Sequence, residues 1–417
     1  MSASYAIIGD GVAGSSAAEQ IREEDPEADI TIITDEGEPL YNRILIKEFA
    51  KGKLPEAPIS IHDEEWYEER NIDLLLNTLV TDIDTDAHTL YTHDDNTIHY
   101  DKLLIATGGT PAELPVKNSD ADGIHHFWTF QDARRIREHA NNADTGVVIG
   151  AGLLGIDLAA VCGSQDIDAH YLMRGNRWWR YGLSEDGAEI IHNGLRDMGV
   201  TPVFNSGADR FEVEDGKVVA TIDANGDRYE SDFVGVAIGL NFNTEFIQDT
   251  DIEIDQGIVV DEYMRTSVDD IYAAGDITRF YDITLDAYAQ NGAWGSAKQQ
   301  GVTAAKTMVA EEQGKDDLME AFDWVSSYSI THFDFPFMSF GFPDLGDDDC
   351  ERKYSETEWR RLAFKDGRLI GGVLIGDLAP QRAYKKLIRE KRTVADQKDV
   401  LLEKSFDPEK LAPTQEQ

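Results

Sequence analysis

The stretch Tyr5-Ala6-Ile7-Ile8-Gly9-Asp10-Gly11-Val12-Ala13-Gly14 decides the fold, because an apolar run passes directly into a G-x-G-x-x-G motif. An alanine-rich segment follows and stops near Pro26, and a second apolar run occupies residues 29 to 34. This order predicts a strand, a helix and a second strand, which is a βαβ unit of the dinucleotide-binding kind. The first glycine makes the turn, the second lets a pyrophosphate approach the backbone, and the third packs helix on strand.

The same plan occurs a second time in the chain. Val147-Val148-Ile149 runs into Gly150-Ala151-Gly152-Leu153-Leu154-Gly155, and a helix to about residue 161 and a strand over residues 169 to 173 are expected next. A glycine-rich turn without a ligand is the alternative for each motif. Because each copy follows a strand and opens a helix, the duplication predicts two nucleotide sites in one chain.

Charge excludes one class of partner. The chain of 417 residues has 38 Lys plus Arg and 80 Asp plus Glu, so that 38 − 80 = −42. Such a field repels nucleic acids and anionic membranes. The acids are spread along the whole chain, as in salt-accumulating halophiles, and we expect the fold to require salt. The length suggests two or three domains, and a hydrophobic content of 41% is enough to fill their cores.

Cysteine and targeting signals are sparse. Cys162 and Cys350 have neither disulfide-framework nor zinc-ligand spacing, so no catalytic thiol and no metal site are expected. A strand over residues 5 to 8 leaves no room for a signal peptide, and no apolar run approaches the ~20 residues that span a bilayer. These features predict a soluble, cytoplasmic protein.

An acidic residue is expected to bind the ribose in the first unit, about 20 residues beyond the glycines. Asp35 lies 35 − 14 = 21 positions after Gly14, at the end of the second apolar run, and Glu36 follows it. Asp35 is the favoured candidate. For Glu36, an ordinary surface position on an acidic protein is a serious alternative.

Two further stretches complete a resemblance to a known family. They are Tyr100-Asp101-Lys102-Leu103-Leu104-Ile105-Ala106-Thr107-Gly108 and Ile271-Tyr272-Ala273-Ala274-Gly275-Asp276. With the two glycine motifs, they resemble the signatures of the two-dinucleotide-binding-domain flavoproteins, the FAD-dependent pyridine nucleotide-disulfide oxidoreductase superfamily. Within it, the chain is similar to the rubredoxin reductase, ferredoxin reductase and nitrite reductase flavoprotein branch.

The resemblance implies an α/β fold with three parts. Two Rossmann-like βαβ nucleotide-binding domains would hold FAD (residues 1–112 and 243–320) and NAD(P) (residues 113–242). A smaller α+β C-terminal domain (residues 321–417) would form an interface, with a homodimer as one option. Hairpin signals at Asp215-Gly216 and Asn225-Gly226 fall inside the second domain.

The FAD contacts are carried over from the matching motifs. Asp276 would accept hydrogen bonds from the ribityl chain, with a helix cap as the alternative role. Trp294 opens a Trp-x-x-Ala-x-x-Gln-Gly segment similar to the family helix under the flavin ring, although a core position is nearly as well supported. The implied FAD-binding residues are Gly9, Gly11, Val12, Ala13, Gly14, Asp35, Glu36, Arg43, Val80, Ala106, Thr107, Gly108, Gly275, Asp276 and Trp294.

The segment Tyr41-Asn42-Arg43 matches a family motif near the flavin and diphosphate. Several branches place a lysine five residues after that arginine, where it bonds flavin N5; here that position is Glu48, and Lys47 stands one earlier. The N5 contact is therefore left unassigned. Residues 41 to 49 contain no cysteine, which excludes the disulfide-reductase and peroxide-reductase branches as thiol enzymes.

The second motif departs from NADH-dependent relatives, which end the following strand with an acid. Met173 and Arg174 stand there, and Arg174 and Arg180 have the six-residue spacing of the NADPH-specific disulfide reductases. Guanidinium groups suit a 2′-phosphate, so NADPH is expected over NADH, with ordinary surface arginines as the alternative. Asp157 replaces a family glutamate that reaches the nicotinamide amide. The implied NAD(P)-binding residues are Gly150, Gly152, Leu153, Leu154, Gly155, Asp157, Arg174 and Arg180.

Three features stand out near the C-terminus. Phe333, Phe335 and Phe337 alternate as on one face of a strand, with Phe340 beyond, and are expected in the core or at a dimer contact. The run from Asp347 to Asp349 is expected to be an exposed loop. Basic residues recur at helical spacing, and their face is a candidate docking site for an acidic electron carrier. The alternative is an ordinary helix that is paired with nearby acids or used at a subunit contact. The basic residues are Arg382, Lys385, Lys386, Arg389, Lys391 and Arg392.

The sequence thus predicts an FAD-dependent NAD(P)H oxidoreductase that passes electrons to a carrier such as rubredoxin or ferredoxin, with no catalytic side chain of its own. One alternative is the flavoprotein component of a nitrite reductase system or an NAD(P)H oxidase. Another is a flavin-bearing redox sensor or assembly protein with little turnover.

Overall fold

The computed structural model describes residues 2–411, which form two compact units. The first unit contains residues 2–42, 57–110 and 241–326, and the second contains residues 43–56, 111–240 and 327–411. Each unit holds one of the two glycine motifs. The division into three domains stays a prediction.

A five-stranded parallel sheet organises the first unit, in the order β19-β7-β1-β2-β3. β1 and β7 read as continuous apolar runs because helices and loops cover both faces of such a sheet. Both are buried along almost their whole length. The strands are β1 (Ser4–Ile8), β2 (Asp29–Ile33), β3 (Ile72–Leu75), β7 (Lys102–Ile105) and β19 (Ile271–Ala273).

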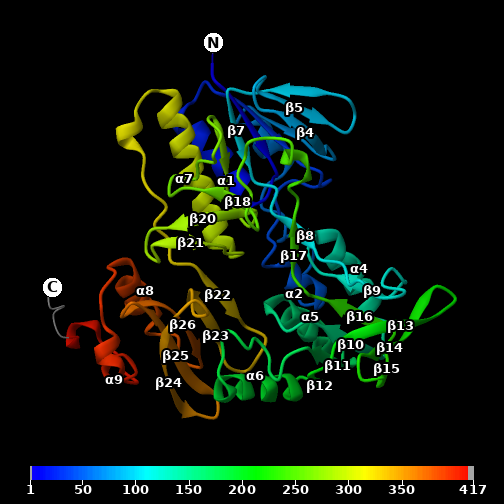
Figure 1. The fold of residues 1–417 in the computed structure, drawn as a ribbon. Coiled ribbons are helices and arrows are strands. Elements are labelled where there is room, and N and C mark those ends of the chain that lie inside the picture. The colour runs from blue at the N-terminus through cyan, green and yellow to red at the C-terminus, as the bar shows by residue number, and fades with distance from the viewer. Residues whose placement is uncertain (1, 412–417) are drawn as a thin grey trace. The chain divides into compact units, whose positions relative to one another are not determined.

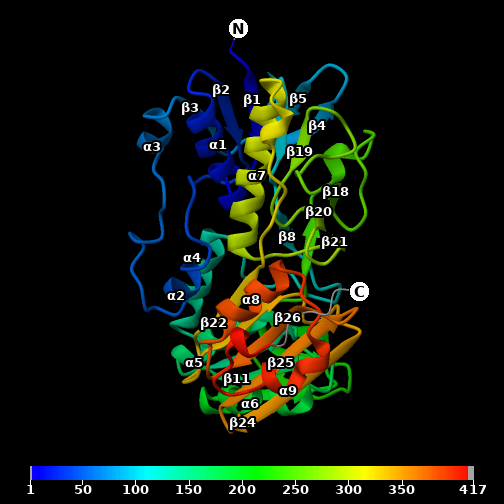
Figure 2. The same ribbon diagram turned by 90° about the vertical axis from the view of Figure 1, so that its left-hand side faces the viewer.

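Two helices, α1 (Val12–Glu24) and α7 (Trp294–Glu312), pack against each other on this sheet, and they run side by side in both Figure 1 and Figure 2. Their approach is close, because a Cβ at Gly301 of α7 would overlap the carbonyl oxygen of Ala13 in the first turn of α1. α1 ends one residue before Asp25 and Pro26, as predicted, since proline cannot continue a helix. The N-terminal ends of both helices thus meet beside the first glycine motif.

Smaller elements complete the first unit. One antiparallel sheet consists of β4 (Val80–Asp84), β5 (Thr89–Thr92) and β6 (Thr97–His99). Another sheet consists of β18 (Ile258–Val260), β20 (Thr278–Asp282) and β21 (Ala287–Ala289). The short helices are α3 (Glu64–Glu68), η1 (Glu245–Ile247) and η2 (Asp316–Leu318).

The second unit repeats the βαβ plan. A parallel sheet in the order β12-β11-β10-β16-β9 carries α5 (Leu153–Ser164), which continues beyond the predicted end near residue 161. Val147, Leu172 and Val234 are among the residues of its buried core. The strands are β9 (Ile124–His126), β10 (Thr145–Ile149), β11 (Asp168–Met173), β12 (Val200–Phe204) and β16 (Phe233–Val236). The α/β class is confirmed.

The predicted hairpin is also confirmed. β13 (Ala208–Glu214) pairs with β14 (Lys217–Asp223), and β15 (Arg228–Glu230) adds a third strand. Asp215 and Gly216 both have positive φ, 49° and 83°, which a two-residue type I′ turn requires. The short element β8 (Gly109–Pro111) and β17 (Leu240–Phe242) lie where the chain passes from one unit to the other.

The C-terminal part forms a third five-stranded sheet, β22-β23-β26-β25-β24, on which α8 (Gln381–Arg389) packs (Figure 2). Its strands are β22 (Ser327–Ile330), β23 (Phe337–Gly341), β24 (Asp348–Ser355), β25 (Glu358–Lys365) and β26 (Arg368–Ile375). The remaining helices of the second unit are α2 (Ile46–Ala50), α4 (Phe130–Ala140), α6 (Glu185–Asp197), α9 (Lys398–Leu401), η3 (Ala395–Gln397) and η4 (Pro408–Lys410).

Three expectations for this part were wrong in detail. Phe333, Phe335, Phe337 and Phe340 are all buried, so their expected core position is confirmed. The strand is shorter than expected, because Phe333 and Phe335 precede β23, where Pro336 interrupts the alternating pattern; their rings stack with centroids 5.1 Å apart. Asp348 and Asp349 are exposed as expected but begin β24, where Asp348 pairs with Lys398 of α9 and Asp349 pairs with Arg361 of the neighbouring strand β25. The basic helix ends at Arg389, and Lys391 has a positive φ of 51°, so that Lys391 and Arg392 lie beyond it.

Over residues 2–411, the helices include none that combines the length and the apolar character needed to cross a membrane.

Candidate functional site

The first glycine motif forms an open turn between β1 and α1. A Cβ at Gly9 would overlap the carbonyl oxygen of Ala106, and one at Gly14 would overlap that of Gly9, so both positions require glycine. Gly11, in contrast, faces open space. It is the N-cap of α1, and no side chain caps the helix there. The unpaired N–H groups of the first turn therefore remain available to an anion such as a diphosphate.

The second motif has the same construction. Gly150 adopts φ 118°, and a Cβ there would overlap the carbonyl oxygen of Ala237. A Cβ at Gly155 would overlap the Tyr171 hydroxyl, whereas Gly152 faces open space and caps α5 without a side-chain bond. Both turns thus exclude side chains on the inner side and leave room where a phosphate would approach.

Several predicted FAD residues gather around the first turn. Gly275 lies 3.3 Å, measured from an added Cβ, from the side chain of Ala13, and its N–H donates to Gln300 Oε1 over 2.7 Å. Asp276 follows at the end of β19, and Trp294 is the first residue of α7. Val80 is buried in β4, in a different sheet of the same unit.

Buried polar atoms without partners point to a ligand in this region. Thr107 Oγ1, Ser296 Oγ and Gln300 Nε2 are fully buried and have no hydrogen-bond partner. Such orphaned groups cost free energy in a folded protein unless a ligand or water satisfies them. Because they occur on β7's C-terminal extension and on α7, they fit a polar cofactor bound between these elements.

The two candidate ribose acids differ in their surroundings. Asp35 is exposed, whereas Glu36 is half-buried and its Oε2 accepts a hydrogen bond of 2.6 Å from the Tyr41 hydroxyl. Both follow β2, at the edge of the sheet where the first glycine turn lies. Both carboxylates therefore follow the carboxyl end of a parallel strand, the sheet edge at which dinucleotide-binding folds hold the ribose.

Arg43 belongs to the second unit, although its neighbours Tyr41 and Asn42 belong to the first. Its guanidinium donates to the carbonyl oxygen of Trp128 over 2.9 Å and lies 5.6 Å from the centre of the Trp128 ring.

Asp157 lies at the centre of a buried charge cluster in the second unit. It is 4% exposed and has three donors around it. Lys47 Nζ is 3.6 Å from Oδ1, the Tyr328 hydroxyl donates to Oδ2 over 3.2 Å, and His332 Nε2 is 2.6 Å from Oδ1. Burial and the charge of Asp157 raise the pKa of Tyr328 well above its ordinary value, so the phenol keeps its proton and donates.

The cluster continues from His332 to the surface. Lys51 Nζ lies 2.9 Å from His332 Nδ1 and 2.6 Å from Glu48 Oε1. Burial lowers the pKa of Lys51, against the opposing effect of Glu48. Because an ammonium group only donates, Nδ1 of His332 accepts, and the ring proton resides on Nε2, which donates to Asp157.

The two predicted arginines lie in the loop after β11. Arg174 and Arg180 are exposed, and Arg180 stacks on the ring of Tyr181 at 4.7 Å. Arg177 has a different role, because it donates to the carbonyl oxygens of Leu183 and Arg180 and so fixes the loop. The loop thus presents two guanidinium groups on a braced backbone.

The basic helix α8 presents fewer cations than predicted. Arg382, Lys386 and Arg389 are exposed, and Lys386 lies 3.6 Å from Glu390. Lys385 instead is half-buried and donates to Ser327 Oγ over 2.8 Å.

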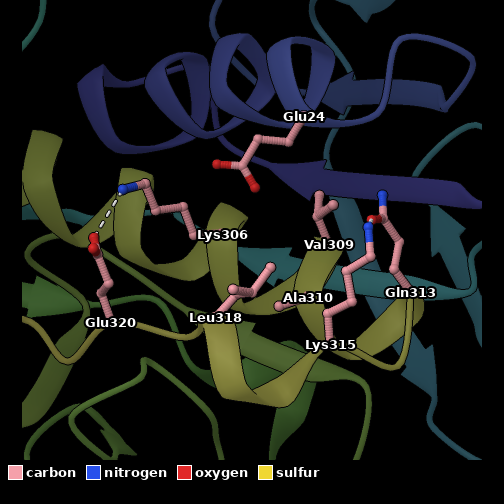
Figure 3. A pocket seen from close by; sticks show the side chains of 8 residues that line it. All are labelled: Glu24, Lys306, Val309, Ala310, Gln313, Lys315, Leu318 and Glu320. Atoms are coloured by element: carbon pink, nitrogen blue, oxygen red, sulfur yellow. Dashed lines mark hydrogen bonds and ion pairs between the residues drawn. The ribbon is translucent and has the colours of Figure 1, made fainter.

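A cavity of about 340 Å³ lies at the opposite end of α1 and α7, lined by residues such as Glu24, Lys306 and Leu318 (Figure 3). Lys306 pairs with Glu320 across its edge. Val12 and Glu24 are twelve residues apart, which corresponds to about 18 Å along a helix. The cavity is therefore separate from the glycine turn.

Sequence reasoning missed several of these groups. Tyr328 and His332 approach Asp157 only because β22 and its following loop pack beside α5 and α2. No local sequence pattern predicts this packing. For Lys47, the sequence shows only a lysine one position before the one that several branches of the family use. Tyr67, which donates to Asp10 in the first glycine motif, lies in a short helix without any motif.

Comparison with known proteins adds family evidence. A family model described as pyridine nucleotide-disulphide oxidoreductase matches residues 3–312. The chain is 26% identical over 395 residues to the NAD(P)H nitrite reductase of Bacillus subtilis, covering 94% of this chain and 48% of that protein. It thus spans about half the length of that relative. With the NADH-rubredoxin oxidoreductase of Clostridium acetobutylicum, identity is 27% over 386 residues, covering 92% and 93% of the two chains.

Solved structures show the same fold. Putidaredoxin reductase in its covalent complex with putidaredoxin has a TM-score of 0.90 at 24% identity, covering 98% of this chain and 97% of that chain. An engineered water-forming NADPH oxidase, bound to NADPH, has a TM-score of 0.84 at 22% identity, covering 99% and 96%.

Proposed function

The chain belongs to the pyridine nucleotide-disulphide oxidoreductase family, and on that premise we propose that it is an FAD-dependent NAD(P)H reductase serving a small electron-carrier protein of the ferredoxin or rubredoxin type. One observation carries this proposal: each unit has its own open glycine turn at an uncapped helix N-terminus. Bound FAD would supply the redox chemistry, by accepting a hydride and returning electrons.

In the first unit, the chain would bind FAD by polar contacts to both ends of the cofactor. The turn Gly9 to Gly14 and the N-terminus of α1 would hold the diphosphate, and Asp35 or Glu36 the ribose. Thr107, Gln300 and Asp276 would satisfy the polar groups nearer the flavin, which accounts for the buried atoms that otherwise have no partner.

In the second unit, Lys47 would help to hold Asp157, which stands at the position of the family glutamate that reaches the nicotinamide amide. Tyr328 and His332 fix the carboxylate from its other sides. Lys47 and Asp157 would together orient the nicotinamide end of NAD(P)H in this unit.

The acceptor is proposed to be a protein and not a disulfide. Burial raises the pKa of Cys162 to about 12 and that of Cys350 to about 12, so neither side chain is a thiolate at neutral pH. The relatives and neighbours named above include one NADH-rubredoxin oxidoreductase and one reductase in a complex with putidaredoxin. This proposal includes docking of the carrier near Arg382, Lys386 and Arg389 of α8. It also includes a cytoplasmic location and assembly as a homodimer.

NADPH is the proposed donor. The engineered NADPH oxidase carries five substitutions, which remove an aspartate and introduce two arginines six positions apart, the first directly after the lost aspartate. Met173, Arg174 and Arg180 show the same arrangement here. This agreement supports Arg174 and Arg180 as ligands of the 2′-phosphate.

A second candidate is the flavoprotein part of a nitrite reductase system. It is favoured by the match to the Bacillus enzyme, which covers 94% of this chain but only 48% of that protein. The remaining half of the Bacillus enzyme lies outside this match.

Anaerobic stopped-flow mixing of the FAD-loaded protein with NADPH and with NADH tests the proposal. Fast bleaching of flavin absorbance, faster with NADPH, is expected. If neither coenzyme reduces the flavin, the protein is not a reductase, and the role of a flavin-bearing sensor or assembly protein takes its place.

A further inference from the structure

An acidic side chain lies inside the first glycine turn. Asp10 stands between Gly9 and Gly11 and is 8% exposed. An ionised carboxylate is an unexpected neighbour for a diphosphate, because like charges at close range raise each other's free energy. Its protonation state therefore matters for binding of FAD.

The hydrogen bonds of Asp10 come from uncharged groups. The Tyr67 hydroxyl lies 3.0 Å from Oδ1 and 2.8 Å from Oδ2 and donates its proton to this carboxyl group. Tyr67 itself is 1% exposed on α3, and the N–H of Leu40 donates to its oxygen over 3.4 Å. The pair is thus enclosed by the turn, by α3 and by the segment after β2.

The charged and titratable groups that act on Asp10 are few. Burial is the largest effect and raises the pKa of Asp10, and the charge of Glu36 raises it as well. The hydrogen bonds from the Tyr67 hydroxyl and the Leu40 N–H lower this pKa, but by less, so that the result is a pKa of about 7. Tyr67 remains a phenol, because burial and the charge of Asp10 raise its pKa. Within residues 2–411, none of the effects found for Asp10 comes from a lysine or an arginine.

We propose that Asp10 binds FAD as the neutral carboxylic acid, so that the apoprotein takes up one proton when FAD docks at the first glycine turn. The balance is Asp10 carboxylate plus H⁺ plus FAD giving Asp10 carboxylic acid with FAD bound. This inference rests on the proposed function, because it requires the diphosphate to lie at the N-terminus of α1.

The sign of the pH dependence follows from linkage. The diphosphate charge raises the pKa of Asp10 further in the complex than in the apoprotein. Below the pKa of the apoprotein, Asp10 is already protonated, and the Kd for FAD does not depend on pH. Above it, each pH unit raises the Kd by about tenfold, until the pKa of the complex is reached. Alkaline conditions therefore release FAD.

The test measures the Kd of FAD for the full-length apoprotein in high salt, by quenching of flavin fluorescence from about pH 6 to pH 9. Calorimetry in two buffers of different ionisation enthalpy gives the number of protons taken up. For the wild type we expect a constant Kd at low pH, a rise of about tenfold per pH unit above neutrality, and uptake approaching one proton.

Three variants sharpen the result. Asp10→Asn keeps the acceptor for Tyr67 and carries no charge, so its Kd is expected to stay low and constant across the range. Tyr67→Phe removes a donor that favours the ionised form, so the rise should begin at higher pH. Glu23→Gln, at the exposed far end of α1, is the control for loss of one negative charge and should behave like the wild type.

The outcomes separate the inference from its premise. A wild-type Kd that is independent of pH, without proton uptake, overturns the inference alone. So does an Asp10→Asn variant with the wild-type slope. If Asp10→Asn does not fold, the direction of the shift in Tyr67→Phe decides. A wild-type protein that binds no FAD at any pH overturns the proposed function itself.

Discussion

His332 Nε2 donates a hydrogen bond of 2.6 Å to Asp157 Oδ1 and joins the loop after β22 to α5. The histidine side chain is 1% exposed and that of Asp157 is 6% exposed. This buried bond fixes the carboxylate that also meets Lys47, in the part of the second unit that follows the second glycine turn.

Replacing Asp157 with alanine is expected to lower the free energy of unfolding more than replacing His332 with alanine. Asp157→Ala leaves Lys47, Tyr328 and His332 without their shared acceptor and should lower the free energy of unfolding by about 3–5 kcal/mol. His332→Ala removes one donor and should lower it by about 1–3 kcal/mol. Urea unfolding of both variants and of the double variant measures the coupling; strictly additive losses would show that the two groups act independently.

Substitution of Gly11, which faces open space, is expected to weaken FAD binding, whereas substitution of Gly14, which is tightly packed, is expected to destabilise the fold. Gly11→Ala places its methyl group in open space at φ −74°, so the apoprotein should keep its unfolding midpoint while the Kd for FAD rises on the order of ten- to a hundredfold. Gly14→Ala overlaps the Gly9 carbonyl and should destabilise the fold itself. Thermal unfolding and flavin fluorescence separate these effects. Unchanged FAD affinity in Gly11→Ala would contradict the placement of the diphosphate.

The preference for NADPH is expected to depend on Arg174 and Arg180. Replacing either with alanine removes a charge-assisted bond worth about 1.5–3 kcal/mol, so KM for NADPH should rise on the order of ten- to a hundredfold while KM for NADH stays unchanged. Arg196→Ala, an exposed arginine paired with Glu189, serves as the control. Equal effects on both coenzymes would argue against recognition of a 2′-phosphate.

Docking through α8 predicts a salt-dependent effect of charge reversal. Lys386→Glu should slow reduction of an acidic carrier on the order of tenfold at low salt, and the difference should shrink as salt screens the field. Lys217→Glu, at an exposed position directly after the hairpin turn of the second unit, is the matched control. Stopped-flow rates for both variants across a salt series make the comparison. Equal rates for the two variants would remove α8 from the interface.

The net charge of −42 predicts stabilisation by salt. The Debye length falls from about 10 Å at 0.1 M to about 3 Å at 1 M, so self-repulsion among surface acids weakens. Each kcal/mol gained should raise Tm by about 2–4 °C. Thermal unfolding in KCl, with sucrose as the uncharged control, measures this. A Tm that does not change with the KCl concentration would contradict the expected adaptation to high salt.

The sequence predicted the two βαβ units because their information is local. Strand, glycine turn and helix follow one another, and Pro26 marks the end of α1. The contacts of Asp157 could not be predicted in this way, since His332 comes from a segment 175 positions away. The strand expected at Phe333 failed for the opposite reason, because Pro336 is a local signal that overrides alternation.

Asp10 shows a third situation, in which a residue was visible inside a recognised motif but its environment was not. The pattern gave no reason to distinguish it from any other residue between two glycines. Burial makes the ionisation of Asp10 costly, and this effect outweighs the hydrogen bonds from the Tyr67 hydroxyl and the Leu40 N–H, which favour the ionised form.

The two cysteines have a practical consequence for experiments on this protein. Because burial raises the pKa of both thiols to about 12, almost none of Cys162 or Cys350 is in the reactive thiolate form at neutral pH. A maleimide dye should therefore leave the native chain unlabelled. A single new cysteine on the exposed side of α8 could then carry a fluorophore without prior removal of the natural ones, and report the arrival of a carrier directly.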